Sequence, residues 1–262
     1  MDTCKFVPDE YIRNIKLKII NFIKNQTGVK KRGKLIYQLM IMGCVMILCY
    51  NCKKESSTTS NPTSGITVTD ADGNVYPTVV IGTQTWMAAN LKTTKYNDGT
   101  SIPLVTNGTV WSTDTTAAYC WYNNDDTTYK NPYGALYNWY AVNTGKLAPT
   151  GWHVPSDAEW ATLVAYLADS TTAGGKLKEA GTSHWQSPNT GATNSTGFTE
   201  VPSGSRYSNG LFYLNGEYGW LWSTTASSSS QAWHEYLVYN SAAIYRVADV
   251  KNIGFSVRCV KN

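Results

Sequence analysis

The stretch that decides the fold is GWHVPSDAEW, at residues 151–160. Within it Ser156 is a natural helix N-cap, and Glu159 three residues later completes a capping-box pattern. From Trp160 the apolar residues recur at helical spacing, at positions 160, 163, 164 and 167, which gives the helix one apolar face. The pattern predicts an amphipathic helix that starts after Ser156 and ends at residues 169–170.

Short strands are predicted on both sides of this helix. Residues 67–102 read as strands separated by turn signals at residues 72–73 and 97–99 and by a turn at residues 82–83. After the helix, strand-like segments lie at residues 211–214, 219–223, 233–238 and 254–260. A weaker second helix is predicted over residues 175–180, followed by a Gly/Ser/Asn/Thr-rich loop to about Tyr207. The sequence therefore predicts an α+β domain with short antiparallel strands, one or two helices and a long loop-rich region.

The composition narrows the class of protein. The chain has 262 residues, of which 15% are charged and 13% aromatic, with ten Trp, eighteen Tyr and five Phe. So many rings, mixed evenly with turn formers, exclude a disordered chain, a coiled coil and a collagen-like fibre. Residues 1–54 carry a net charge of +8, while residues 55–262 carry −4. A nucleic-acid partner therefore has no electrostatic support from the main domain.

The first 52 residues read as an N-terminal extension and an export signal. Basic residues at 30–34 precede an apolar run of sixteen residues at 35–50, too short for a stable membrane-spanning helix. Cys52 follows, and the pattern resembles a bacterial lipoprotein signal in which that cysteine carries lipid. The alternatives are lipidation at Cys44 or Cys49, a signal without lipid, or a simple membrane anchor. Residues 53–65 form a flexible polar linker, and the domain covers residues 66–262.

Two cysteines lie in the domain, Cys120 and Cys259. In an oxidising compartment such a pair favours a disulfide between an early segment and the C-terminal strand. Two buried unpaired thiols are the other interpretation, and both remain open at this point. Arg258, beside Cys259, is expected to pair with a partly buried carboxylate and to support the fold.

No complete catalytic or metal-binding pattern appears in the domain. Neither an HExxH motif nor a Gly-x-Ser-x-Gly elbow is present, and the first-turn carboxylates Asp157 and Glu159 suit the helix dipole. Asp125 and Asp126 are weak candidates for calcium ligands, because they lie in an oxygen-rich stretch that could hold the ion. No other cofactor is expected.

The aromatic residues of the C-terminal half are the strongest binding candidates. Exposed rings can stack on sugars or anchor a protein partner. Rings alternating on strands are equally typical of a core, so this second interpretation stays open. The residues expected to form a ligand surface are Trp220, Trp222, Trp233 and Tyr239.

Several long motifs together resemble the Fibrobacter succinogenes major paralogous domain family. Besides residues 151–160, they are IGTQTWMAANL at 81–91, YCWYNND at 119–125, NPYGALYNWY at 131–140 and GFSVRCV at 254–260. The resemblance covers about residues 66–262, in the right order. It implies an exported protein or lipoprotein of Bacteroidetes-type bacteria, with no defined molecular activity.

The same motifs are similar, more loosely, to formylglycine-generating enzymes and C-type lectins. This kinship implies a C-type-lectin-like fold with paired termini and a ligand-carrying loop region. It also implies that members often have a cysteine where this chain has Ala148, so that Cys259 lacks its usual partner. The copper-binding thiol pair of such oxidases and the calcium-binding strings of such lectins are missing here.

The functional expectation is an exported cell-envelope lipoprotein, anchored by lipid and placed in the outer membrane. Its domain is expected to be a non-catalytic module that binds a polysaccharide or another surface protein. The alternatives are an enzyme of unknown type that uses the 181–235 loops, or a structural or adhesive envelope component. An enzyme predicts a cleft with titratable groups around His184, His234 or Glu235, whereas a binder predicts a shallow Trp/Tyr patch.

Overall fold

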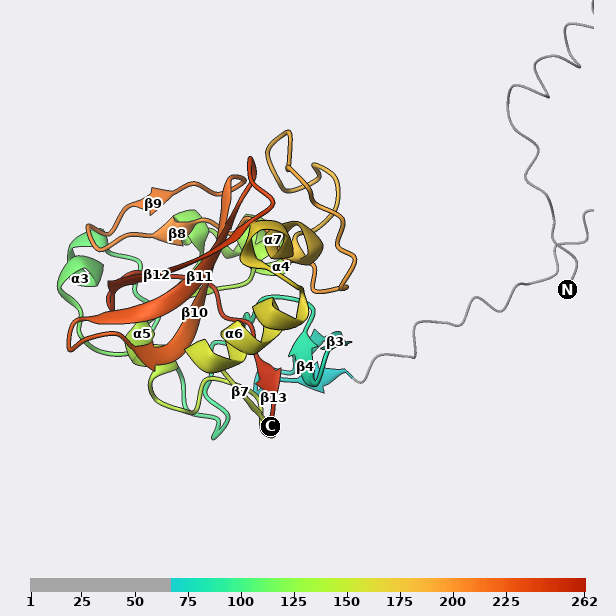
Figure 1. Cartoon of the computed structure of the whole chain (residues 1–262). Helices are drawn as coiled ribbons and strands as arrows, with labels where there is room; N and C mark the ends of the chain where they lie inside the picture. Colours follow the sequence, from blue (N-terminus) through green and yellow to red (C-terminus); the bar gives the residue numbers. More distant parts are fainter. Residues whose placement is uncertain (1–66) are drawn as a thin grey trace, which may run out of the picture. The chain divides into compact units, whose positions relative to one another are not determined.

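The computed structural model describes residues 67–262. This part of the chain is a mixture of short antiparallel strands and few helices, as predicted (Figure 1). The strands are β1 Val68–Thr69, β2 Val75–Tyr76, β3 Thr78–Ile81, β4 Gln84–Met87, β5 Tyr119–Cys120, β6 Leu136–Tyr137, β7 Trp152–His153, β8 Ser205–Arg206, β9 Phe212–Tyr213, β10 Tyr218–Ala226, β11 Gln231–Val238, β12 Ile244–Val250 and β13 Val260–Lys261. The helices are α3 Gly108–Thr113, α4 Asp126–Tyr133, α5 Trp139–Val142, α6 Asp157–Tyr166 and α7 Ser170–Leu177, with a 3₁₀ turn η1 at Tyr122–Asn124.

The three longest strands form an antiparallel sheet in the order β10-β11-β12. Its register places Trp220 opposite Tyr236, and Tyr236 opposite Tyr245. Because side chains alternate along a strand, each residue is thereby assigned to one of two faces. Helices α6 and α7 lie against one face of this sheet (Figure 1).

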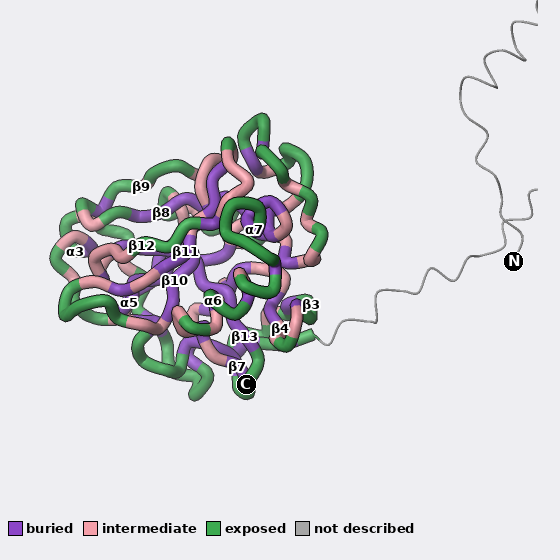
Figure 2. The backbone as a smooth tube through the Cα atoms, in the orientation of Figure 1, coloured by how far each residue is buried: buried purple, intermediate pink, exposed green. Residues whose placement is uncertain are grey.

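The two faces of the sheet pack into different hydrophobic clusters. On the helix side, Leu221 and Leu237 join Trp160 and Leu163 of α6. On the other side, Trp222 packs in a larger cluster that includes Phe255. Figure 2 shows the buried segments concentrated in the middle of the domain and the exposed segments around its periphery.

The beginning and the end of the domain meet in a second sheet, of order β3-β4-β13-β7. Val260 of β13 lies opposite Trp86 of β4 on one side and His153 of β7 on the other. The predicted turn between β3 and β4 is present, with Gly82 at a φ of 62°, in the left-handed region that glycine tolerates. Strand β13 thus fixes the β3–β4 hairpin and the segment before α6.

The predicted capping box of α6 is confirmed. The Ser156 hydroxyl accepts from the Glu159 backbone N–H at 3.3 Å, and the Glu159 carboxylate accepts from the Ser156 N–H at 2.7 Å. The second helix was predicted wrongly, because it begins at Ser170 rather than residue 175. Asp169 does not simply end α6: its carboxylate accepts from the N–H of Thr171 at 2.7 Å and so caps α7.

The long loop region between α7 and β8 is held by buried cations. Lys178 donates to the carbonyls of Thr190, Val238 and Ser241 at 2.8–3.0 Å. The predicted pairing of Arg258 is confirmed, since it lies 2.8 Å from Glu200, and both side chains are fully buried. These bonds hold a segment that has little regular structure of its own.

The sequence analysis predicts several elements too few. Among those that it does not assign are strand β12 and helices α3 and α4. The strand predicted over residues 254–260 was too long, because only Val260–Lys261 is a regular strand and residues 254–256 make isolated bridges. The missed strand β12 matters most, because it carries part of the surface described next.

Candidate functional site

A set of tyrosines gathers on the sheet face opposite α6 and on the adjacent β8–β9 hairpin. We call this set the tyrosine face; it consists of Tyr207, Tyr213, Tyr218, Tyr236 and Tyr245. The rings of Tyr236 and Tyr245 stack at 4.8 Å with an interplanar angle of 14°. Tyr207 and Tyr213 meet edge to face at 5.3 Å. The rings therefore support one another in fixed positions.

The tyrosine face is open at its rim. Tyr207, Tyr213 and Tyr245 are 36–38% exposed, whereas Tyr218 and Tyr236 are half-buried. Tyr218 in turn stacks at 4.8 Å on Trp220, which belongs to the core. Exposed rings fixed by a buried layer can offer flat apolar surface without losing much side-chain entropy on binding.

A carboxylate lies on the same sheet face as these rings. Asp249 follows Tyr245 by four residues along β12, and its side chain is 35% exposed. One of its oxygens is 3.0 Å from Nε2 of the buried His234. Burial, and after it the negative charge of Asp249, raise the pKa of Tyr207, so the carboxylate also acts on the hairpin side. Asp249 can therefore accept hydrogen bonds beside an aromatic surface.

The expected ligand surface was wrong for two of its four residues. Trp220 is only 6% exposed and Trp222 is fully buried. Both point inward against Phe255, and the indole N–H of Trp222 donates to the Tyr137 carbonyl at 2.9 Å. The core interpretation holds for these two rings, since even-numbered residues of β10 face the larger cluster.

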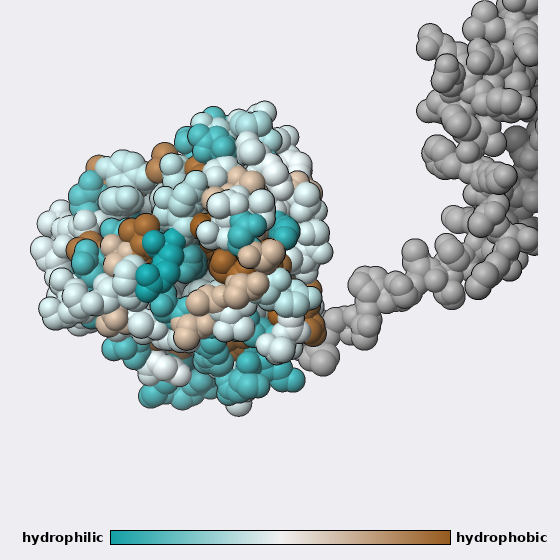
Figure 3. Space-filling view, viewed as in Figure 1, coloured by the Kyte–Doolittle hydropathy of each residue, from teal (hydrophilic) through white to brown (hydrophobic). Residues whose placement is uncertain are grey.

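Trp233 and Tyr239 do not belong to the tyrosine face either. Trp233 lies on the α6 side of β11, and the guanidinium of Arg246 covers its ring at 3.4 Å. Arg246 is in turn held by both oxygens of Asp157. Tyr239 is half-buried and packs against the cluster around Trp160. Figure 3 views this side of the domain, where hydrophobic residues form separate small patches among hydrophilic ones.

The residues named for an enzyme are dispersed. His234 is 1% exposed and Glu235 is 4% exposed, and as strand neighbours they face opposite sides of the sheet. Burial, and then the nearby Asp157, raise the pKa of Glu235 to about 8, although Arg246 opposes the shift. His184 lines a cavity.

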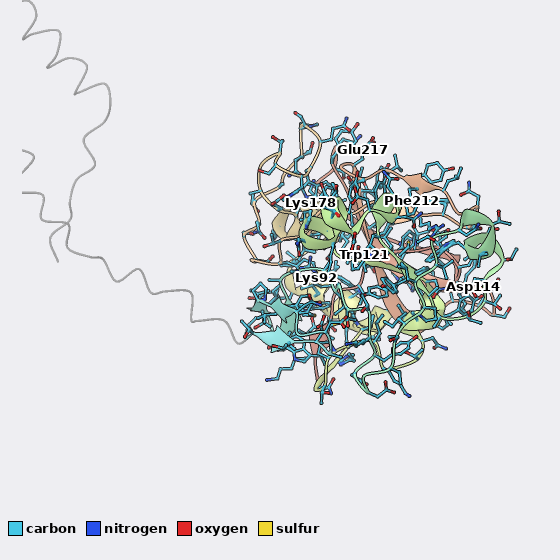
Figure 4. All side chains as sticks on the ribbon, turned by 180° about the vertical axis from the view of Figure 1, so that it is seen from behind. Lys92, Asp114, Trp121, Lys178, Phe212 and Glu217 are labelled. Atoms are coloured by element: carbon cyan, nitrogen blue, oxygen red, sulfur yellow. The ribbon has the colours of Figure 1, made fainter. Side chains whose placement is uncertain are left out.

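That cavity has a volume of about 220 Å³ and lies near β2 and the end of α4. Its polar lining includes Lys92, Asn131, Glu179 and His184, together with Tyr76, Asn90 and Thr199. The Lys92 ammonium donates to the Asn131 side chain at 3.0 Å, and Glu179 lies 2.9 Å from Nδ1 of His184. Figure 4, which shows the domain from behind, labels Lys92. Sequence analysis had singled out His184 but neither Lys92 nor Glu179.

The two domain cysteines are not bonded to each other. Cys120 and Cys259 are both free and buried, in separate hydrophobic clusters. Burial raises the pKa of Cys120 to about 12 and that of Cys259 higher still, so neither is a reactive thiolate. The unpaired-thiol interpretation therefore replaces the disulfide. Ala148 belongs to the same buried cluster as Cys259.

The calcium candidates serve a helix instead. The Asp125 carboxylate accepts from the Thr128 backbone N–H at 3.0 Å and caps α4, and Asp126 occupies the first turn. Within residues 67–262, no group of three or more His, Cys, Asp or Glu side chains is placed to hold a metal ion. The oxygen-rich stretch is thus explained by the dipole and N–H groups of a helix that the sequence analysis missed.

The expectations for the leader lie outside the described residues. They concern residues 1–52, the lipidated Cys52 with its alternatives Cys44 and Cys49, and the linker at 53–65. In the described part, none of the helices has the length and apolar character needed to cross a membrane.

Comparison with known proteins identifies the family. The Fibrobacter succinogenes major domain matches residues 79–261, which is most of the chain. Searches of curated proteins and of solved structures found no match. The family expected from the motifs is therefore confirmed, and this chain belongs to the Fibrobacter succinogenes major domain family.

Proposed function

We propose that this domain is a non-catalytic binding module for a polysaccharide, displayed by an exported cell-envelope lipoprotein. The tyrosine face carries this proposal: it combines stacked, partly exposed rings with the Asp249 carboxylate. Flat rings complement the apolar faces of sugars, and a carboxylate accepts hydrogen bonds from their hydroxyl groups. A protein partner is the alternative occupant of the same surface.

The enzyme alternative has less support. His234 and Glu235, two of its named residues, are almost fully buried and face opposite sides of β11. The third, His184, lies at the small cavity described above. A catalytic site needs titratable groups that converge on one substrate, and these three residues do not share one.

The finer fold assignment also remains our proposal. A C-type-lectin-like arrangement is supported by the pairing of β13 with the β3–β4 hairpin, which brings the two ends of the domain together. The long loop region between α7 and β8 supports it as well.

The binding proposal is tested with a panel of plant and bacterial polysaccharides, with calcium and then with a chelator. We expect saturable binding that the double variant Tyr236→Ala/Tyr245→Ala loses. The matched control is Tyr166→Ala, which removes a 63% exposed tyrosine of α6, outside the tyrosine face. Failure to bind any member of the panel would favour the protein partner or a structural role. Chelator sensitivity would show that binding depends on a metal ion.

The lipid anchor needs a separate test. The leader pattern that ends at Cys52 supports it. Labelled palmitate should enter the wild-type protein in its bacterial host but not a Cys52→Ala variant. Equal labelling of both proteins would refute Cys52 as the attachment site, and cell fractionation of the wild type would test the outer-membrane location.

A further inference from the structure

The cavity near β2 and α4 shares no lining residue with the tyrosine face. One side of it carries the ammonium of Lys92, whose only hydrogen bond in residues 67–262 is to the neutral Asn131 side chain. No carboxylate of the described residues forms an ion pair with Lys92, although Lys92 is half-buried. The Lys92–Asn131 bond is exposed, so the ammonium is accessible from solvent, and an ammonium without a carboxylate partner can pair with an incoming anion.

The Glu179–His184 pair of the cavity lining has a defined hydrogen-bonding direction. Both oxygens of Glu179 lie 2.9 Å from Nδ1 of His184, and the ring packs edge to face on Tyr133 at 5.5 Å. Because a carboxylate only accepts, the proton between them belongs to Nδ1. In the neutral ring, Nε2 is then an acceptor, and it has no partner in the described part of the chain.

The remaining lining limits the kind of anion. Apolar walls come from Val75, Ala88, Ala89, Pro132 and Val201. Lys92 is the only Lys or Arg of the lining, and Glu179 places a negative charge nearby. A phosphate, with its higher charge, would need more cationic or N–H donors than this cavity provides. A single carboxylate on a small partly apolar body matches the volume of about 220 Å³.

We propose that this cavity is a second ligand site, which binds a small hydroxy acid of the sugar-acid class. The ligand carboxylate would pair with Lys92, and a ligand hydroxyl would donate to Nε2 of His184. Asn131 would orient the Lys92 ammonium. The site is separate from the polysaccharide surface and does not depend on it.

The test uses the imidazole signals in a ¹H–¹³C NMR spectrum of the full chain, at constant pH. The protein has three histidines, so each signal is assigned by one His→Gln substitution. The probes are sodium D-glucuronate and sodium D-galacturonate, with D-glucose as the neutral match and inorganic phosphate as the alternative anion. We expect either sugar acid to move the His184 signal in a saturable way. His153 and His234 should not respond, and glucose and phosphate should act weakly or not at all.

Two variants complete the test. Lys92→Met should weaken sugar-acid binding about 10-fold or more, because it removes the charge-assisted contact. Lys95→Met is the matched control and should bind normally, since Lys95 pairs with Asp72 at 3.3 Å and does not line the cavity. The proposal is overturned if neither sugar acid moves the His184 signal, if binding survives Lys92→Met, or if glucose or phosphate binds as well. Unchanged polysaccharide binding by Lys92→Met would show that the two sites are separate.

Discussion

Both faces of the β10–β12 sheet carry aromatic side chains, but the contacts of these side chains differ between the two faces. On the α6 side, Trp233 is covered by Arg246, which is itself held by Asp157. On the other side, Tyr236 and Tyr245 stack on each other; Tyr236 is half-buried and Tyr245 is 37% exposed. An aromatic ring on a strand therefore stays accessible only where no neighbouring side chain has already covered it.

The largest expected effect is a loss of stability, which should be greater for the buried Trp222 than for Trp233, whose ring is covered by Arg246. Trp222→Ala should lower the free energy of unfolding by about 3–5 kcal/mol, because it leaves a cavity against Phe255 and removes the N–H bond to Tyr137. Trp233→Ala should cost roughly 1–2 kcal/mol, since its ring is half-buried and mainly contacts Arg246. Urea unfolding followed by circular dichroism measures both. Equal losses would show that Trp233 is as much a part of the core as Trp222.

The next effect concerns the carboxyl group buried on the α6 side. The pKa of Glu235 is raised to about 8 in the folded protein, mainly by burial, from an ordinary value of 4.5. The folded state therefore holds this proton more tightly than the unfolded state, and stability falls as the pH rises from about 4.5 to about 8. Glu235→Gln should remove this loss and stabilise the protein by a few kcal/mol at pH 9.

The control is the same comparison of wild type with Glu235→Gln at low pH. Near pH 4 the Glu235 carboxyl is protonated in both states, so wild type and Glu235→Gln should unfold at similar urea concentrations. A variant that is less stable than wild type at pH 9 would mean that the ionised Glu235 is stabilised by Arg246 more than it is destabilised by burial and Asp157.

A smaller effect is expected at the carboxylate of the tyrosine face. Asp249→Asn should weaken polysaccharide binding about 10-fold, because a neutral amide accepts hydrogen bonds from sugar hydroxyls less strongly. The Asn side chain can still accept from the His234 ring, so thermal unfolding should change little. An unchanged affinity would restrict the binding contribution of this face to its rings.

The smallest effect is expected for the exposed ion pair on the α6 side. The side chains of Arg246 and Asp157 are 44% and 23% exposed. Arg246→Met should therefore cost about 0–1 kcal/mol of stability, and less at high salt. It should also uncover Trp233, which would increase the quenching of tryptophan fluorescence by iodide. A loss of several kcal/mol would mean that the pair supports the core.

Local signals in the sequence predicted the parts of the fold that depend on local chemistry. The α6 capping box, the β3–β4 hairpin and the strands around Trp222 and Trp233 follow from capping, turn residues and alternation. The start of α7 was missed because Asp169 was taken as the end of one helix and not as the cap of the next. Strand β12 has mixed polar and apolar residues, and only its pairing with β11 defines it.

The candidate site was harder to predict because exposure depends on tertiary contacts. Alternation within one strand cannot relate Trp220 on β10 to Trp233 on β11, because only the register of the two strands assigns them to opposite faces. It also cannot show which face is covered by α6 and which by Phe255. Only the register between β11 and β12 places Tyr236 and Asp249 on the same sheet face. Asp125 was misread as a calcium candidate because the helix that it caps has a weak pattern, with Pro132 near its end.

The most direct measurement compares the two sheet faces in one binding experiment. Isothermal titration of the best-binding polysaccharide would be carried out with wild type, Tyr236→Ala/Tyr245→Ala and Trp233→Ala. The account predicts that the double tyrosine variant loses at least about 10-fold in affinity, since each stacked ring contributes roughly 0.5–1.5 kcal/mol beyond its buried area. It also predicts that Trp233→Ala binds like wild type. Normal binding by the tyrosine variant, with loss in Trp233→Ala, would place the ligand on the α6 side and contradict the account.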